Sequence, residues 1–378
     1  MMQTVSIVGG SNGGYAAAGD FADQGFDVQW YVRSPEHHRE VLKGNRLTLR
    51  VSEDYVGRRT PGTERTVALD QVTTDLGAAI AAADVILVPL PTTTHRAVSR
   101  ELAPHIKDGQ TVVVSPGNVG SVYFRRAIDD LEDPPSGVVV AETSTLPYVA
   151  RKSGPGEVTI NLDAVQLPVG AFPGRDAERA HRDLSELYDT ALAAENALDA
   201  ALNNSNVGVN ATPTIINAGA IDCGEFEFNV HRHGVTEHTL EVVLAIDHER
   251  VRLREALGYK APHFTLEGYY EPGPETGDHF YGANAREALT VADTFSRDPP
   301  SLDDRYVHED VRIATVLQAS LGEFLDLETP MLDAILSLAE VMMGERYGEN
   351  GRNLDALGFD VTDTEELEAT IERGFEAA

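Results

Sequence analysis

The chain has 378 residues, enough for two domains, and its 42% share of hydrophobic residues is ordinary for a globular protein. No run approaches the ~18 consecutive apolar residues that span a bilayer. The first residues lead straight into an apolar strand without the basic region of a signal peptide, so we expect a cytoplasmic protein. The single cysteine, Cys223, excludes an internal disulfide framework, and we expect it to be a buried structural thiol. Histidines and acidic residues are scattered, which predicts no metal site.

Acidic residues dominate the charge of the chain, with 61 of them against 30 basic ones and a formal net charge of −31. Such a surface repels itself at low ionic strength. Molar salt shortens the screening length to about 3 Å and removes that repulsion. The balance therefore predicts a protein adapted to a salt-rich cytoplasm, with a merely acidic protein of ordinary salt as the alternative. It also disfavours nucleic acid as a partner.

In chain order, the first half alternates β-rich runs with helical stretches, which predicts a parallel sheet with helices on its faces. The expected strands cover residues 4–8, 27–32, 46–51, 85–89, 111–115, 138–142 and 157–161. The expected helices cover residues 13–24, 75–83 and 94–105. The strands are largely apolar, which fits strands that are buried on both faces.

Helical periodicity dominates from residue 176 onward. The expected helices cover residues 176–202, 237–257, 283–295, 305–324, 329–343 and 364–375. We therefore expect an α/β domain with a doubly wound parallel sheet over residues 1–188. An all-α domain should follow over residues 189–378.

A glycine-rich loop joins the first expected strand to the first expected helix. It consists of Gly9, Gly10, Ser11, Asn12, Gly13 and Gly14. Glycine lets a backbone turn tightly and approach a pyrophosphate, while the helix N-terminus attracts the anion. Ser11 departs from the usual pattern of three glycines, so its side chain must point away from the phosphates or hydrogen-bond one of them. The context predicts a Rossmann-type dinucleotide-binding domain, with a plain tight turn as the alternative.

The end of the second expected strand bears on the choice between NAD and NADP. An acidic residue there would bind the ribose hydroxyls of NAD, but none occurs before Glu36. Arg33 could instead hold a 2′-phosphate, which slightly favours NADP. NAD stays open, because Arg33 could simply cover the adenine face.

Several segments together resemble the opine dehydrogenases, the NAD/NADP octopine/nopaline dehydrogenase family. They are the glycine loop and residues 87–89 with His95, 115–120, 141–148, 214–219, 305–311 and 351–354. The resemblance covers nearly the whole chain, and residues 141–148 and 305–311 are its most specific parts. It implies a helical second domain like the C-terminal domain of 6-phosphogluconate dehydrogenase.

The resemblance also implies a reaction, in which hydride from NAD(P)H reduces an imine formed from an amino acid and a 2-keto acid. Such a site needs a cation for a carboxylate and a proton carrier with a pKa near 7. The family pattern implies a histidine as carrier, an orienting aspartate at Asp310 and a substrate-binding arginine at Arg305. The alternatives without a role in the site are a solvated helix residue for Asp310 and a surface ion pair for Arg305.

The loops of the first domain should contact the cofactor or the substrate. The carboxyl ends of the strands in open α/β sheets bind ligands, and Pro89, Glu142 and Thr143 follow or end such strands. His95 is a further candidate for contact. The alternatives are capping of a strand end for Glu142 and Thr143 and a water-facing position for His95.

The implied histidine is missing, because its position falls on Asn210. Asparagine cannot carry a proton at neutral pH. Another histidine could substitute, with His308 nearest to Asp310 and with His231 and His233 as further candidates. Alternatively, water supplies the proton and the chain reduces a 2-keto acid without an amine, or the chain is a nucleotide-binding sensor with little activity. We expect small-molecule substrates and leave a homodimer open.

Overall fold

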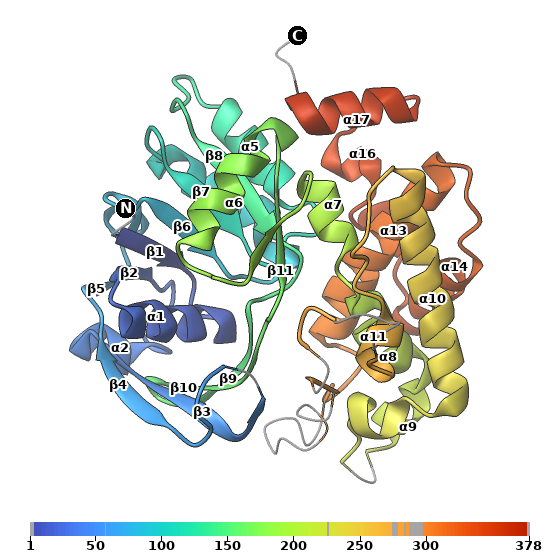
Figure 1. Ribbon diagram of the computed structural model, residues 1–378, viewed down its shortest axis with the longest axis horizontal. Coiled ribbons are helices and arrows are strands. Elements are labelled where there is room, and N and C mark those ends of the chain that lie inside the picture. Colours follow the sequence, from blue (N-terminus) through green and yellow to red (C-terminus); the bar gives the residue numbers. More distant parts are fainter. Residues whose placement is uncertain are drawn as a thin grey trace. The chain divides into compact units, whose positions relative to one another are not determined.

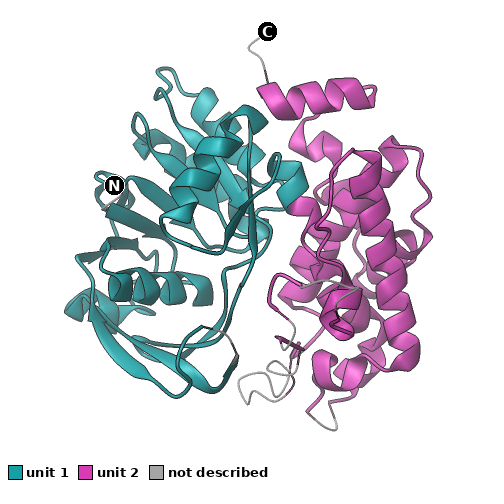
Figure 2. Cartoon of the chain, viewed as in Figure 1, with its two compact units in different colours: residues 1–200 teal, residues 201–378 magenta. Residues whose placement is uncertain are grey.

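The computed structural model describes residues 4–56, 58–224, 227–273, 279–282, 285–286, 290 and 298–375 (Figure 1). The chain forms two compact units, residues 1–200 and 201–378 (Figure 2). The helix expected over residues 283–295 lies almost entirely outside the described residues.

An eight-stranded sheet forms the centre of unit 1, in the order β12-β11-β8-β7-β6-β1-β2-β5. Its strands are β1 (Thr4–Val8), β2 (Asp27–Tyr31), β5 (Gln71–Thr73), β6 (Val85–Val88), β7 (Thr111–Val114), β8 (Val139–Thr143), β11 (Leu167–Ala171) and β12 (Ala191–Ala193). Neighbouring strands pair in parallel along the part of the sheet that runs β8-β7-β6-β1-β2-β5, while β11 is antiparallel to β8. This confirms the predicted doubly wound sheet, whose order reverses at β1, directly before the glycine loop.

Helices and short 3-10 turns connect these strands. They are α1 (Asn12–Gln24), α2 (Arg39–Gly44), α3 (Leu76–Ile80), η1 (Thr92–Thr94), α4 (His95–Leu102), η2 (Ala103–His105), α5 (Ser121–Asp129), η3 (Gly174–Asp176), α6 (Ala177–Ser185) and α7 (Ala197–Leu202). The prediction of continuous helix over 176–202 was wrong in its middle. Residues 191–193 form β12 instead, which pairs in parallel with β11 at the edge of the sheet. The alanine-rich sequence favours a helix locally, but pairing with β11 stabilises a strand here, and such non-local hydrogen bonds cannot be inferred from local sequence.

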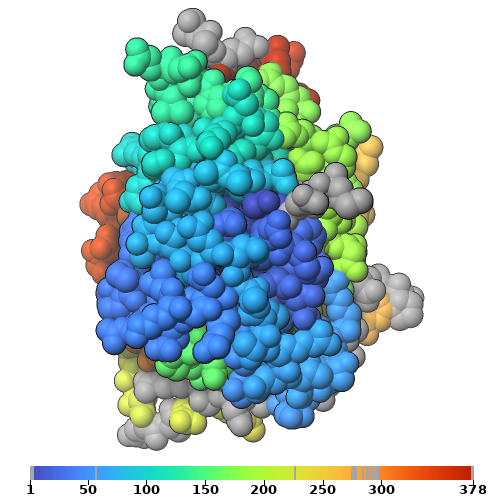
Figure 3. Space-filling view, turned by 90° about the vertical axis from the view of Figure 1, so that its left-hand side faces the viewer, coloured from blue at the N-terminus to red at the C-terminus, as the bar shows by residue number. Residues whose placement is uncertain are grey.

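A second, four-stranded sheet in unit 1 was not expected. Its order is β4-β3-β10-β9, with β4 (Glu64–Ala68), β3 (Arg46–Val56), β10 (Glu157–Asp163) and β9 (Tyr148–Gly154). The strands expected near residues 46–51 and 157–161 exist, but they pair with each other and not with the main sheet. In Figure 3 a small green area of the surface, the colour of residues near 150, borders the blue surface of the N-terminal region. Helix α1 contacts both sheets and so lies between them.

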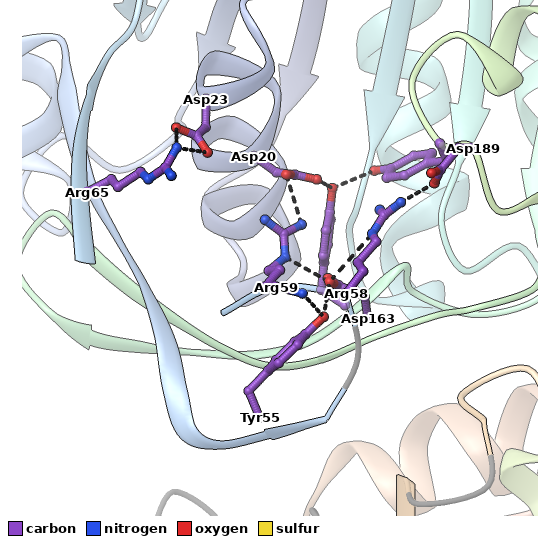
Figure 4. A network of polar contacts seen from close by, with 10 residues as sticks. Asp20, Asp23, Tyr55, Arg58, Arg59, Arg65, Asp163 and Asp189 are labelled. Carbon is purple, nitrogen blue, oxygen red and sulfur yellow. Dashed lines mark hydrogen bonds and ion pairs between the residues drawn. The ribbon is translucent and has the colours of Figure 1, made fainter. Parts of the chain in front are cut away.

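Buried charges fasten the second sheet to α1 (Figure 4). The guanidinium of Arg59 lies 2.8 Å from Asp20 on α1 and 2.7 Å from Asp163 at the end of β10. The hydroxyl of Tyr55 donates to Asp163 at 2.6 Å, and that of Tyr148 donates to Asp20 at 2.7 Å. Both carboxylates are buried. Arg59 therefore bridges the two buried carboxylates, and Arg58 lies 3.9 Å from Asp163 as a second, more distant cation.

Unit 2 is helical, which confirms the predicted second fold class. Its elements are η4 (Val207–Ala211), α8 (Thr212–Ile216), α9 (Ala218–Cys223), η5 (Val230–Gly234), α10 (Glu237–Ala256), α11 (Leu266–Tyr270), η7 (Tyr306–Thr315), α13 (Val316–Phe324), α14 (Pro330–Met343), α15 (Tyr347–Asn350), α16 (Leu354–Leu357) and α17 (Thr364–Arg373). Unit 2 also contains an isolated β-bridge between Asn229 and Asp298. None of the described helices is long and apolar enough to span a membrane.

The long helix α10 organises unit 2 through buried charged side chains. The Glu249 carboxylate accepts hydrogen bonds from the backbone N–H groups of Met331 and Leu332, each at 2.9 Å. A carboxylate is favourable at this helix N-terminus because the first-turn N–H groups have no partner within the helix. One residue further along, Arg250 pairs with Asp247 at 2.8 Å in the interior. The Glu249 hydrogen bonds fix the start of α14 against α10.

The expectation of a buried Cys223 was wrong. The thiol is exposed at the end of α9, and Gly224 follows in the left-handed conformation that ends the helix. Ile221 is the only buried residue of α9. The helix presents Cys223 to solvent because only one of its sides is covered.

Candidate functional site

The glycine loop has a backbone that requires glycine at two positions. Gly9 has φ +122°, a region that side chains rarely adopt. A Cβ on Gly14 would lie 2.3 Å from the carbonyl oxygen of Gly9. These are the first and third positions of the dinucleotide pattern, where a tight turn and close contact between helix and strand are needed. The loop therefore fits the dinucleotide predicted for it.

Ser11 occupies the position where the pattern has its second glycine. Its hydroxyl oxygen accepts from the backbone N–H of Gly14 at 3.0 Å and caps α1. The same hydroxyl donates to the carbonyl of Pro89 at 2.5 Å. The side chain is thus occupied within the protein, and it ties the glycine loop to the loop after β6. The N–H groups of Asn12 and Gly13 have no acceptor within the helix and suit an anion.

Two residues that the sequence did not single out lie against this loop. The ammonium of Lys152, on β9, donates to the carbonyl of Gly10 at 3.2 Å. The ring of His38 covers Gly10 so closely that a Cβ there would meet its Nε2 at 2.3 Å. Burial lowers the pKa of Lys152, and burial together with the charge of Lys152 lowers the pKa of His38. In the sequence, only the small number of lysines, four in the chain, could have drawn attention to Lys152.

Arg33 lies at the surface just beyond β2, where the sequence predicted a contact with the 2′-phosphate. Its guanidinium pairs with Glu101 at 2.6 Å, and the two side chains are 63% and 50% exposed. An ion pair this exposed contributes only about 0–1 kcal/mol. The guanidinium can therefore exchange Glu101 for a phosphate at little cost.

Glu142 and Thr143 are fully buried at the end of β8. The Glu142 carboxylate accepts from the N–H groups of Val119 at 2.7 Å and Ser121 at 3.0 Å. Val119 has φ +62°, an unfavourable conformation for a β-branched residue, which this bond helps to hold. Thr143 shares a 2.7 Å hydrogen bond with the hydroxyl of Ser115. These contacts favour the alternative in which both residues cap the end of the strand, and they also hold the 115–120 loop.

His95 is fully buried at the start of α4, so the water-facing alternative was wrong. Its Nε2 lies 3.4 Å from the carbonyl of Leu90, and its ring packs edge-on against Phe124. A Cβ on Gly120 would come within 2.1 Å of its Nδ1. The ring therefore packs against the loops that follow β6 and β7.

In unit 2, the structure brings Asn210 and Asp310 together. They lie on η4 and η7, two π-helical stretches that pack against each other. Such stretches are rare and frequently mark functional sites. The amide of Asn210 donates from Nδ2 to Asp310 Oδ2 at 3.0 Å, with 6% and 3% of the two residues exposed. Burial raises the pKa of Asp310 to about 7, against the opposing charge of Arg305.

Arg305 begins the same π-helical stretch, and its side chain is exposed. The guanidinium lies over the ring of Tyr306, with 4.6 Å to the ring centroid. Within the described residues, no carboxylate forms an ion pair with it. The alternative for Arg305, a helix-surface ion pair with Asp303 or Glu309, is not observed among the described residues, and Asp303 pairs with His308.

None of the three candidate histidines contacts Asp310. His308 bonds Asp303 at 2.6 Å, on the outer side of η7. His231 is buried and lies 3.3 Å from the hydroxyl of Tyr306. His233 accepts from the backbone N–H of Asn229 at 3.1 Å. The geometry gives no support to a substitute histidine beside Asp310.

Each unit thus contributes a distinct chemistry. The loop in unit 1 offers backbone N–H groups and the ammonium of Lys152 to a dinucleotide. Unit 2 offers the exposed cation of Arg305 and the buried pair of Asn210 and Asp310. Among the described residues, no group of three or more histidine, cysteine or acidic side chains could hold a metal ion.

Comparison with known sequences finds relatives along the whole chain. Residues 193–343 match the family model for the α-helical domain of NAD/NADP octopine/nopaline dehydrogenase. An opine dehydrogenase of Arthrobacter sp. (strain 1C) is 27% identical over 359 residues, which are 94% of this chain and 95% of the relative. Vitopine synthase of Allorhizobium ampelinum is 23% identical, again over 94% of this chain and 95% of the relative.

Solved structures of such enzymes share the fold. Octopine dehydrogenase with NADH and agmatine has a TM-score of 0.72 at 18% identity, covering 100% of this chain and 99% of that one. Yersinopine dehydrogenase with NADP+ bound has a TM-score of 0.65 at 14% identity, covering 98% of each chain. Together with the glycine loop and the helical second unit, these relationships make the chain similar to NAD(P)-dependent opine dehydrogenases along nearly its whole length.

Proposed function

We propose that the chain joins an amino acid to a 2-keto acid by NAD(P)H-dependent reduction of their imine. The observation that carries this proposal is the exposed guanidinium of Arg305. Among the described residues no carboxylate forms an ion pair with this guanidinium, so it is available to a substrate carboxylate. Arginine binds a carboxylate through two parallel hydrogen bonds. One related octopine dehydrogenase structure contains NADH with pyruvate and another contains NADH with L-arginine, which supports substrates of these classes.

The reaction divides between the two ends of the imine. The amine nitrogen attacks the keto carbon, and water leaves as the C=N bond forms. When bound, the reduced nicotinamide supplies a hydride to the imine carbon, and the nitrogen takes up a proton to give a secondary amine. In this chain the glycine loop and Lys152 would hold the pyrophosphate, and Arg305 would orient the substrate carboxylate.

The direct test is oxidation of NADPH and NADH with a panel of 2-keto acids, each assayed with and without amino acids. Turnover that requires both substrates is the expected result. Turnover without an amine would replace the proposal by a 2-keto acid reductase, the candidate that Asn210 favours. Tight cofactor binding without turnover would instead identify a nucleotide-binding sensor.

Replacing Arg305 by glutamine is expected to lower kcat/KM about 10- to 150-fold, mainly through KM for the keto acid. The reason is the loss of a charge-assisted hydrogen bond contributing about 1.5–3 kcal/mol. Arg346→Gln is the matched control, because that arginine only pairs with Glu349 at the surface. Steady-state kinetics in which both variants behave alike would remove Arg305 from the site.

For the cofactor, we propose a preference for NADP through Arg33. Arg33→Ser should raise the Kd of NADPH about tenfold or more and leave that of NADH nearly unchanged, because only NADPH carries the 2′-phosphate. Fluorescence titration of both cofactors measures this. Arg65→Ser, at another exposed ion pair of unit 1, is the control. An equal loss for both cofactors would restrict Arg33 to the adenine face.

We also propose that the protein works in a salt-rich cytoplasm. Its Tm should rise as KCl increases from about 0.1 M to about 2 M, because salt screens the self-repulsion of a chain with net charge −31. Thermal unfolding followed by circular dichroism measures the effect, and a non-ionic osmolyte separates screening from exclusion. A Tm that stays constant in KCl would favour the merely acidic alternative.

A further inference from the structure

The pairing of Asn210 with Asp310 has a chemical consequence for the proton that the reduction consumes. The resemblance to the family implies a histidine that carries the proton and an aspartate that orients it. Here the first of these positions holds an amide, which neither gains nor loses a proton near neutral pH. Asp310 is therefore the only titratable member of the pair.

We propose that Asp310 itself carries the catalytic proton and that Asn210 orients its carboxyl group. This inference rests on the proposed imine reduction. The carboxyl is 3% exposed, it accepts a 3.0 Å hydrogen bond from Asn210 Nδ2 at Oδ2, and the side chain of Asn206 also hydrogen-bonds it.

The surroundings of Asp310 favour the protonated form. On its own helix, Glu309 raises its pKa and Arg305 lowers it; burial outweighs both and sets the value at about 7. The packed element η4 contributes only neutral amides, Asn210 and the preceding Asn206. Helices α13, α14 and α15 also pack against η7. Their carboxylates are Glu323, Asp333, Glu340 and Glu349, and none forms a hydrogen bond or ion pair with Asp310 among the described residues.

The proton balance follows directly. In the reduction, the O–H bond of the Asp310 carboxylic acid breaks, and its proton goes to the imine nitrogen as the hydride reaches the carbon. The resulting carboxylate recovers a proton from water before the next turnover. A carboxyl with a pKa near the working pH suits both steps.

Infrared spectroscopy tests the protonation without relying on turnover. In the full-length chain in molar KCl, the difference spectrum between the wild type and Asp310→Asn should show a carboxylic acid C=O band below about pH 7 that vanishes above it. Asn210→His, which keeps the carboxyl, should remove the band near neutral pH, because an imidazolium favours the carboxylate. A carboxylate already ionised at about pH 5 in the wild type would overturn the proposal.

Stability provides a second readout. An unfolded aspartate has a pKa near 3.9, whereas that of the folded Asp310 is about 7. The folded chain therefore binds more protons between these values, and stability falls as the pH rises from about 4 to about 7. Asp310→Asn should remove this part of the pH dependence in urea unfolding; an unchanged slope would contradict the assignment.

Kinetics then separate a catalytic role from a structural one. Asp310→Asn should lower kcat about 10²- to 10⁴-fold, while the Kd of NADPH stays unchanged. Asn210→Ala removes a hydrogen bond that stabilises the carboxylate, so the fall of kcat at high pH should move to higher pH. Asp303→Asn, an exposed carboxylate nearby, is the control. A pH profile that Asn210→Ala leaves in place would refute the role of Asp310.

The two proposals fail in different ways. If no keto acid and amine pair is turned over, the imine reduction is lost, yet the infrared titration still reports on Asp310. If turnover occurs and the carboxyl is ionised throughout, the proposed reaction stands and another group supplies the proton.

Discussion

Replacing Arg59 by glutamine is expected to lower the free energy of unfolding by about 3–5 kcal/mol. The variant leaves Asp20 buried without an ion-pair partner and Asp163 with only the more distant Arg58, 3.9 Å away, and an uncompensated buried charge costs that much. These carboxylates fasten the second sheet to α1, so the loss concerns two layers of unit 1. Urea unfolding at constant KCl concentration measures it.

The control for this prediction lies in the same view of the structure (Figure 4). Arg65 pairs with Asp23 at 3.0 Å, but the arginine side chain is 66% exposed. Arg65→Gln should therefore cost only about 0–1 kcal/mol. Equal losses in the two variants would mean that the Arg59 cluster is hydrated and contributes no more than a surface pair.

Replacing Gly14 by alanine should weaken binding of NADPH on the order of 10²-fold. Its Cβ would lie 2.3 Å from the carbonyl oxygen of Gly9, a backbone atom that cannot rotate away. The loop must then move by a sizeable fraction of an ångström, and displacements of about 1 Å in a site can cost 10²-fold. Fluorescence titration with the reduced cofactor measures the effect.

Gly219→Ala is the matched substitution. This glycine has no atom within 4 Å of the added Cβ and lies in α9. Alanine should stabilise the helix by about 0.5–1 kcal/mol and leave cofactor binding intact. If Gly14→Ala binds NADPH normally, the glycine loop is not the dinucleotide site.

Local patterns were sufficient for much of the fold. Strand β1 and helix α1 begin and end within one residue of their predicted limits, because apolar periodicity and glycine act over a few residues. Strand pairing is not local in this sense. The sequence of β3 does not reveal that β10, more than a hundred residues later, is its partner, so the second sheet was missed.

The candidate site shows the same division. The sequence showed the motif around residues 305–311 and the asparagine in place of the implied histidine at position 210. It did not show the environment of these side chains. Lys152 reaches Gly10 across 142 positions of the chain, which no spacing rule anticipates. Glu142 and His95 were legible as candidates, but only their packing reveals that they are buried beneath loops.

The sequence alone determined the dinucleotide-binding fold, the helical second unit and the asparagine at the position implied for the histidine, because each of these depends on residue type and local order. Only tertiary structure showed that none of the three candidate histidines contacts Asp310. Tertiary structure decided which charges are buried. It buried Asp310 beside a neutral amide, and it set Arg59 between two carboxylates. Burial governs these outcomes because the free energy of a charge depends on the solvent and partners around it, which only the folded chain arranges.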